Sequence, residues 1–313
     1  MKKILIVGAH TAVAKSLVEC LLERDLDAEL IRATTTDNIE AELTLLDEQT
    51  IKSADLAVLA FGGKFARGIG EGLLKLKKPV IDLSGTFSPT DGARTVFGGL
   101  DPLAHLQVEP GSVVSIPIGP AAPVVAALEA LTAFLPRRAT VVTQESAVSF
   151  DQPGLDELSA QVRAVFNMKD AETEIFRATL AFNSWPLAPE SEEAMIAQLR
   201  AGLVPRAPAL VALPLFVTRT LVPTFSADSL VLEVEVEGTP DAETVAGALA
   251  AARTLHKGDP ELVALDAVGR DDALVTHLRV GPGRIGAWMA YDRMRLGSAT
   301  QAARLIEAWL APR

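Results

Sequence analysis

The sequence predicts a two-domain α/β protein, in which a Rossmann-like, doubly wound parallel sheet is joined to a second domain of the α+β class. Three observations support this. Over the first 120 residues, short apolar strands end in small residues and alternate with helices, as in parallel sheets covered on both faces. After about Leu135 the strands become longer and several alternate in polarity. The 313 residues also exceed what one simple core accommodates. We expect one domain at residues 1–122 plus 296–313 and the other at 123–295.

In the first domain, the strands are apolar runs of four to seven residues that end in small residues, and we expect a helix after the first of them at residues 13–23. A Pro/Gly turn at Gly119 and Pro120 precedes an amphipathic helix, because proline fits the first helical turn. Two interpretations of this turn are open. It directs the N-terminus of a helix, with its partial positive charge, toward a bound group, or it serves only as a turn. The predicted strands are residues 4–7, 28–31, 54–60, 80–83 and 113–116.

In the second domain, longer strands and three further helices indicate a mixed or antiparallel sheet. Strict alternation over residues 229–237 predicts one buried face and one wet, acidic face. The predicted strands are residues 139–149, 210–220, 229–237, 274–278 and 285–291, and the helices are residues 151–165, 189–203 and 241–255, with a terminal helix at 297–310.

Composition and charge exclude several function classes. The net charge is −11 and no run of basic residues stands out, so we expect neither nucleic acid nor an anionic membrane as a partner. The basic N-terminus reaches Gly8 and His10 too soon for a signal peptide and is better interpreted as a strand in a cytoplasmic protein. Cys20 is the single cysteine, which excludes an internal disulfide. The four histidines show no metal-ligand spacing, and we expect no metal site; they are His10, His105, His256 and His277.

The loop after the first strand has the context of a dinucleotide phosphate cradle, since it opens a helix. The chemistry asks for three glycines, and only Gly8 is present. Thr11 and Ala14 occupy the other two positions, and Thr11 places a β-branched side chain where phosphate would come closest. A Rossmann-type turn that binds nothing tightly is an equal interpretation. The candidate cofactor contacts are Gly8, His10, Thr11, Ala12, Val13, Arg32, Gly62 and Gly63, among which Arg32 faces either a 2′-phosphate or solvent.

Other strand ends carry the polar groups expected at a crevice. Glu145 and Ser146 end the first strand of the second domain, and Arg219 ends another. Arg219 is either a substrate or anion contact, or a surface or interface ion pair. These elements give no confident Ser-His-Asp or Cys-His arrangement.

Several short strings follow one another in a shared order, and through them the chain resembles the aspartate-semialdehyde dehydrogenases along nearly all its length. More narrowly, it resembles their usg-type, non-catalytic relatives. The resemblance implies a dimerisation-type second domain, a homodimer with an interface of obligate type, and NADP as the cofactor. The strings are Gly8-Ala9, Phe61-Gly62-Gly63, Val80-Ile-Asp-Leu-Ser84, Ile116-Pro117, Ser146-Ala-Val-Ser149, Gly154-Leu-Asp-Glu-Leu158, Phe182-Asn183, Leu213-Pro214 and Tyr291-Asp-Arg293.

The resemblance also implies where catalytic groups should stand, and there the chain differs. The family's nucleophilic cysteine aligns with Gly119, its glutamine with Ser146 and its general-base histidine with Arg219. Its substrate-binding arginine aligns with Ala212, and its phosphate-holding arginine with Ser88. In the family chemistry the thiolate forms a thiohemiacetal, the histidine moves protons and hydride passes to NADP.

Two hypotheses follow. The preferred one is a non-catalytic homologue that binds a small molecule or a protein partner. The alternative is an NADP-dependent oxidoreductase acting on an aldehyde through a different set of residues, with Glu145, Ser146 and Arg219 nearest the crevice.

Overall fold

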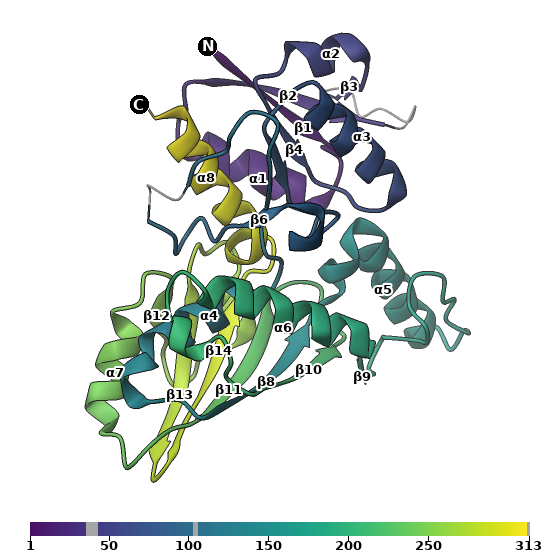
Figure 1. Ribbon diagram of the computed structural model, residues 1–313. Coiled ribbons are helices and arrows are strands. Elements are labelled where there is room, and N and C mark those ends of the chain that lie inside the picture. The colour runs from purple at the N-terminus through teal and green to yellow at the C-terminus, as the bar shows by residue number, and fades with distance from the viewer. Residues whose placement is uncertain (36–42, 103–105, 312–313) are drawn as a thin grey trace. The chain divides into compact units, whose positions relative to one another are not determined.

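The computed structural model describes residues 1–35, 43–102 and 106–311 (Figure 1). His105 lies outside the described residues. The chain divides into two compact units, Met1–Ile118 with Ser298–Arg313, and Gly119–Gly297. We call them unit 1 and unit 2 and describe each separately.

Unit 1 is built on a seven-stranded sheet in which every neighbouring pair of strands is parallel, in the order β3-β2-β1-β4-β5-β7-β6. The order reverses between β1 and β4, which is the switch point of a doubly wound sheet. The predicted fold class is therefore confirmed. The elements are β1 (Lys2–Val7), α1 (Ala12–Leu22), β2 (Ala28–Thr34), β3 (Thr44–Leu45), α2 (Glu48–Ser53), β4 (Leu56–Leu59), α3 (Lys64–Lys75), β5 (Val80–Asp82), β6 (Arg94–Thr95), β7 (Val113–Ser115) and α8 (Thr300–Leu310).

Both faces of this sheet are buried because successive strand residues point to opposite sides. Ile4 and Ile6 of β1 pack with α1 and α8, and Leu5 and Val7 pack with α2 and α3. The continuous apolar runs of the sequence are explained by this two-sided burial.

Unit 2 is built on a seven-stranded mixed sheet in the order β12-β13-β14-β11-β8-β10-β9 (Figure 1). β8 pairs in parallel with β10 and in antiparallel with β11. The elements are α4 (Ala121–Ala130), β8 (Arg138–Glu145), α5 (Asp151–Phe166), β9 (Trp185–Pro186), α6 (Pro189–Leu203), β10 (Leu215–Leu221), β11 (Asp228–Glu235), α7 (Ala242–Ala250), β12 (Leu255–Lys257), β13 (Ala273–Gly281) and β14 (Arg284–Tyr291).

The alternation on β11 has the predicted consequence. Leu230, Leu232 and Val234 are buried, and Val231 and Glu233 lie on the other, more exposed face. Three other predictions were wrong in detail. The α4 helix is buried on all sides from Ala121 to Leu128, so it is not amphipathic. Residues 208–210 form a 3₁₀ turn before β10, and the strand β12 ends the stretch predicted as one long helix.

A π-helical turn, Arg295–Ala299, precedes α8 in place of the first turn of the predicted terminal helix. In the described part of the chain, no helix combines the length and the apolar character that crossing a bilayer requires.

Candidate functional site

The position that the resemblance aligns with the family's nucleophile, Gly119, is a glycine that is required by its backbone and its surroundings. Gly119 has φ +73°, in the left-handed region that favours glycine. Its N–H donates to the Gly297 carbonyl at 3.0 Å, which fixes the turn ahead of α4. A Cβ added at Gly119 would lie 2.9 Å from Nη1 of Arg293 and 3.2 Å from its Cζ. The guanidinium of Arg293 therefore fills the space into which a side chain at position 119 would project.

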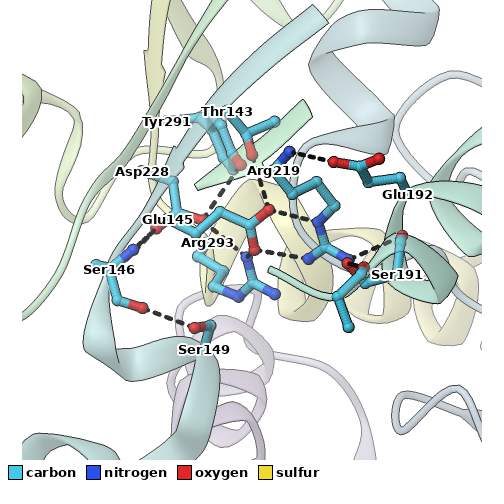
Figure 2. A network of polar contacts seen from close by, with 11 residues as sticks. Thr143, Glu145, Ser146, Ser149, Ser191, Glu192, Arg219, Asp228, Tyr291 and Arg293 are labelled. Atoms are coloured by element: carbon cyan, nitrogen blue, oxygen red, sulfur yellow. Dashed lines mark hydrogen bonds and ion pairs between the residues drawn. The ribbon is translucent and has the colours of Figure 1, made fainter. Parts of the chain in front are cut away.

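Arg293 is the centre of a buried charge network (Figure 2). Its Nη1 donates to Oε2 of Glu145 and to Oδ2 of Asp228, both at 2.8 Å. Arg219 grips Glu145 from another side, with Nε to Oε1 and Nη2 to Oε2 both at 2.6 Å. Such bidentate pairs are the strongest and most directional of the side-chain ion pairs. Two guanidinium groups thus balance two carboxylates.

Neutral groups complete the network. The backbone N–H and the hydroxyl of Ser146 donate to Oδ1 of Asp228 at 2.9 and 2.6 Å, and the Tyr291 hydroxyl donates to Oδ2 at 3.2 Å. The Thr143 hydroxyl donates to Oε1 of Glu145 at 2.9 Å. Every carboxylate oxygen of Glu145 and Asp228 therefore accepts at least two hydrogen bonds, apart from any made to solvent.

Sheet register brings these residues together. Asp228 at the start of β11 pairs with Tyr291 at the end of β14, and Leu221 of β10 pairs with Glu145 at the end of β8. Because these strand termini meet at one edge of the sheet, residues distant in sequence become neighbours there. Arg293 follows β14 by two residues and reaches the same edge.

The electrostatics favour the charged forms of Glu145 and Arg293. Burial raises the pKa of Glu145, but Arg293 and Arg219 outweigh burial and lower it to about 2. Burial raises the pKa of Asp228, against the opposing effect of Arg293, which Asp228 shares with Glu145. Burial lowers the pKa of Arg293, and the two carboxylates more than reverse this and raise it. Tyr291 has its pKa raised by burial first and by the nearby carboxylates second, so it remains a neutral donor.

This arrangement differs from the polar crevice that the sequence predicts. Glu145 and Ser146 were expected to face a crevice, but both are fully buried. Arg219 is mostly buried and is paired with Glu145, and its Nη1 also donates to the Ser191 carbonyl at 3.1 Å. Arg219 therefore forms an internal ion pair, which is neither of the two alternatives that the sequence left open. A guanidinium does not act as a base, because its pKa lies far above neutral pH.

The structure brings three of the five family-aligned positions together. Gly119, Ser146 and Arg219 all lie on or next to the network. Ala212 is exposed on a turn before β10, whereas Arg219 lies near the other end of that strand, on the order of 13 Å from its start. Ser88 caps a 3₁₀ turn in unit 1, where its hydroxyl donates to Asp91 at 2.8 Å.

In the predicted phosphate cradle, the Thr11 side chain points in a different direction from the one that the sequence suggests. The Thr11 side chain is buried, and its hydroxyl lies 2.9 Å from the Gly8 carbonyl and 3.1 Å from the Ala60 carbonyl. It also accepts from the N–H of Ala14 and so caps α1. Thr11 is therefore turned into the sheet and does not project toward a phosphate, contrary to the expected crowding.

The other candidate cofactor contacts lie at or near the carboxyl ends of the unit 1 strands. Gly8 has φ +84°, and a Cβ there would lie 2.8 Å from Cδ1 of Phe61, so this glycine is needed for the turn. The exposed His10 has its Nδ1 3.3 Å from the Thr34 hydroxyl. The remaining residues are Ala12 and Val13, which begin α1, Arg32 on β2, and Gly62 and Gly63 before α3.

Gly63 leaves open space at the start of α3. It has φ +95°, and a Cβ built there meets nothing within 4 Å. Among the described residues, no group of three or more acidic, histidine or cysteine side chains is arranged to hold a metal ion.

Sequence reasoning missed Asp228, and it noted Arg293 and Tyr291 only as part of a string. The feature of the sequence that could have indicated Asp228 and Arg293 is a charged residue at or just beyond the end of a strand. Sequence alone does not give the register that sets these residues against Glu145.

Several known proteins are similar to this chain over nearly its whole length. No family model matches the chain. The USG-1 protein homolog of Azotobacter vinelandii is 29% identical over 328 residues, covering 97% of this chain and 96% of the relative. Three further relatives, each named as an aspartate-semialdehyde dehydrogenase, are 22–24% identical over 96–97% of this chain.

Solved structures share the fold. Aspartate semialdehyde dehydrogenase II of Vibrio cholerae, in complex with ASA, matches with a TM-score of 0.84 at 22% identity over 98% of each chain. The enzyme of Candida albicans, in a structure with NADP, matches with a TM-score of 0.72 at 13% identity over 99% of this chain and 98% of that one. The shared order of sequence strings and these full-length sequence likenesses identify the chain as a homologue of the aspartate-semialdehyde dehydrogenases and of the USG-1 protein, and the solved structures show the same fold.

Proposed function

We propose that this chain is a semialdehyde dehydrogenase homologue that does not catalyse the family reaction and works as a binding or interaction protein. The observation that carries the proposal is the pairing of Gly119 with Arg293. A glycine supplies no nucleophile, and the guanidinium lies where a thiol at that position would project. Without a thiolate the covalent route is lost, and with it a large part of a rate enhancement that in enzymes is typically ~10⁶-fold or greater.

The network supports the same proposal because it leaves no group poised for proton transfer. Glu145 has a pKa of about 2, far from the near-neutral value that favours a general base. Both of its oxygens are held by arginines. Ser146 has its hydroxyl bonded to Asp228. These contacts argue against the alternative of an aldehyde oxidoreductase that uses Glu145, Ser146 and Arg219.

NADP is the cofactor that the family suggests, and unit 1 fits it. Thr11 is turned inward, and the space at Gly63 is open. The turn at Gly8 and the N-termini of α1 and α3 would hold the pyrophosphate, with Arg32 near the adenosine end. Bound NADP would supply a hydride acceptor. Retained NADP binding without turnover is therefore compatible with the proposal, and the cytoplasmic location stays a prediction.

A homodimer through unit 2 is the assembly we propose. The solvent-side face of its sheet carries apolar side chains on three adjacent strands, Val142, Phe216 and Val231, which are 37%, 57% and 36% exposed. Register places Val142 next to both Val231 and Thr218. An obligate interface of about 2,000 Å² or more would cover this face. A sedimentation mass of one chain at micromolar concentration would contradict the dimer.

The test of the proposed function is reduction of NADP by the purified protein with aspartate semialdehyde and phosphate present. We expect a rate equal to that of the protein-free mixture. The positive control is an aspartate-semialdehyde dehydrogenase from the same family, assayed in the same mixture. A wild-type rate above the blank that falls in Arg219→Gln would support the oxidoreductase alternative.

Calorimetric titration with NADP, in the absence of aldehyde, measures cofactor binding separately from catalysis. Saturable binding together with no turnover identifies a nucleotide-binding homologue. No heat of binding identifies a protein that acts through another surface. Either result leaves the catalytic proposal to the turnover assay.

A further inference from the structure

Unit 2 contains a cavity of about 310 Å³ that lies away from the Glu145 network. It lies between α7 and the sheet edge formed by β12 and β13. This volume is at the lower end of the range of small-molecule pockets. Its lining residues are Ala246, Leu249, Ala250, His256, Lys257, Gly258, Pro260, Val275, Thr276, His277 and Leu278.

The walls of the cavity are apolar. Leu249 of α7 and Val275 of β13 are buried and both line the cavity. Ala246 and Ala250 are small, so the helix leaves room above the strand. Burial of hydrocarbon here would stabilise a complex through the hydrophobic effect.

The polar lining includes a lysine, two histidines and a threonine. Lys257, His256 and His277 are all exposed, and none of the described lining residues is acidic. The carboxylate of Asp259, on the adjoining turn, accepts from the Glu261 N–H at 2.9 Å. In a chain of net charge −11, Lys257 places a positive charge at the rim of an apolar space.

The backbone around the opening is fixed in place. A bulge between Thr276 and Arg279 interrupts the pairing of β13 with β14, and His277 in that bulge has φ +50°. Bulges of this kind redirect side chains next to sites. The turn after β12 is tied to β13, since the Gly258 N–H donates to the Val275 carbonyl at 2.8 Å. The Thr276 hydroxyl donates to the Asp259 carbonyl at 3.0 Å.

We propose that this cavity binds a small carboxylate with an apolar body, of the medium-chain fatty acid type. The hydrocarbon would lie against Leu249 and Val275, and the carboxylate would meet Lys257, which pairs with Val275 and shares its face of the sheet. Charge complementarity selects an acid, because an amine would face Lys257, and a neutral alcohol would gain no charged contact.

The test uses calorimetry of the full chain with three probes of equal length, octanoate, octanol and octylamine. We expect octanoate to bind with one site per chain, octanol to bind about ten-fold more weakly, and octylamine not to bind. Two variants locate the site. Lys257→Glu should weaken octanoate about ten-fold, and Ala250→Trp should abolish binding by filling the cavity from an exposed position.

Matched controls make the result decisive. Lys169→Glu changes the net charge equally at another exposed position of unit 2 and should leave octanoate affinity unchanged. Circular dichroism checks that Ala250→Trp is folded, and Lys257→Glu, at a surface position, provides an independent test. Absence of octanoate binding, equal affinity for octanoate and octylamine, or unchanged affinity in both Lys257→Glu and Ala250→Trp would overturn the proposal.

Discussion

Alanine at position 119 should destabilise unit 2 more than any backbone effect explains. At φ +73°, a residue with a Cβ costs about 1–2 kcal/mol relative to glycine. The new Cβ would also lie 2.9 Å from Nη1 of Arg293, the atom that donates to both Glu145 and Asp228. Losing one hydrogen bond between charged groups costs about 1.5–3 kcal/mol, and displacing the guanidinium altogether costs about 3–5 kcal/mol. We therefore expect Gly119→Ala to lower the free energy of unfolding by about 3 kcal/mol or more.

Gly238→Ala is the matched control. Gly238 lies in the same unit with φ +70°, and a Cβ there meets nothing within 4 Å. It should cost only the backbone term, about 1–2 kcal/mol. Urea denaturation measures both variants, and hydrogen exchange of peptides from β8, β11 and β14 localises the effect. Equal costs for the two substitutions, within about 0.5 kcal/mol, would refute the role given to Arg293.

A double-mutant cycle assigns the excess cost to Arg293. Arg293→Lys keeps the positive charge but removes the planar fork that approaches Gly119. The excess cost of Gly119→Ala should therefore shrink in the Arg293→Lys background. A cost that is the same in both backgrounds would show that another contact is responsible.

Three further outcomes are expected. Because the pKa of Glu145 is lowered from 4.5 to about 2, its ionised form stabilises the protein above pH 4.5, and about 3 kcal/mol of that stability is lost as the pH falls through about 2. Urea midpoints measured against pH should therefore fall less on acidification in Glu145→Gln than in the wild type, and an equal fall in both would contradict the assignment. Thr11→Gly should lower the free energy of unfolding by about 1 kcal/mol through loss of the α1 cap, without tightening NADP binding, whereas Thr11→Ser should leave stability nearly unchanged. Tighter NADP binding by Thr11→Gly in calorimetry would support the crowding explanation instead. Positions 119 and 20 are both buried, and Gly119→Cys should still be alkylated faster than Cys20, because the Arg293 guanidinium beside the new sulfur favours the reactive thiolate; mass spectrometry that found Cys20 modified first would be inconsistent with this.

The fold was predictable from periodicity because most elements follow one local rule. Continuous apolar runs such as residues 4–7 mark strands buried on both faces, and the alternation after Asp228 marks a strand with one exposed face. The errors arose where tertiary contacts decide. The α4 helix has an apolar sequence that local rules interpret as one-sided, but the surroundings bury all of it. Two-residue strands such as β9 exist only because a neighbour pairs with them.

The candidate site was only partly predictable, since register and side-chain direction are not local properties. Resemblance identified Gly119, Ser146 and Arg219, and these positions lie together. Nothing in the sequence indicates that Asp228 faces Ser146, or that Arg293 fills the space beside Gly119. For Thr11, residue type suggested an obstacle, whereas the hydroxyl found two carbonyls inside the fold.

A single-turnover experiment detects even very slow aldehyde oxidation by this protein. With the protein in excess over aspartate semialdehyde, and with NADP and phosphate present, even one slow reaction per site would produce measurable NADPH. We expect no NADPH beyond that of the protein-free mixture, because the position aligned with the family's nucleophile is a glycine whose side-chain space is occupied by Arg293. NADPH formed in proportion to the protein, and abolished in Glu145→Gln or Arg219→Gln, would contradict it and show that the buried network is catalytic.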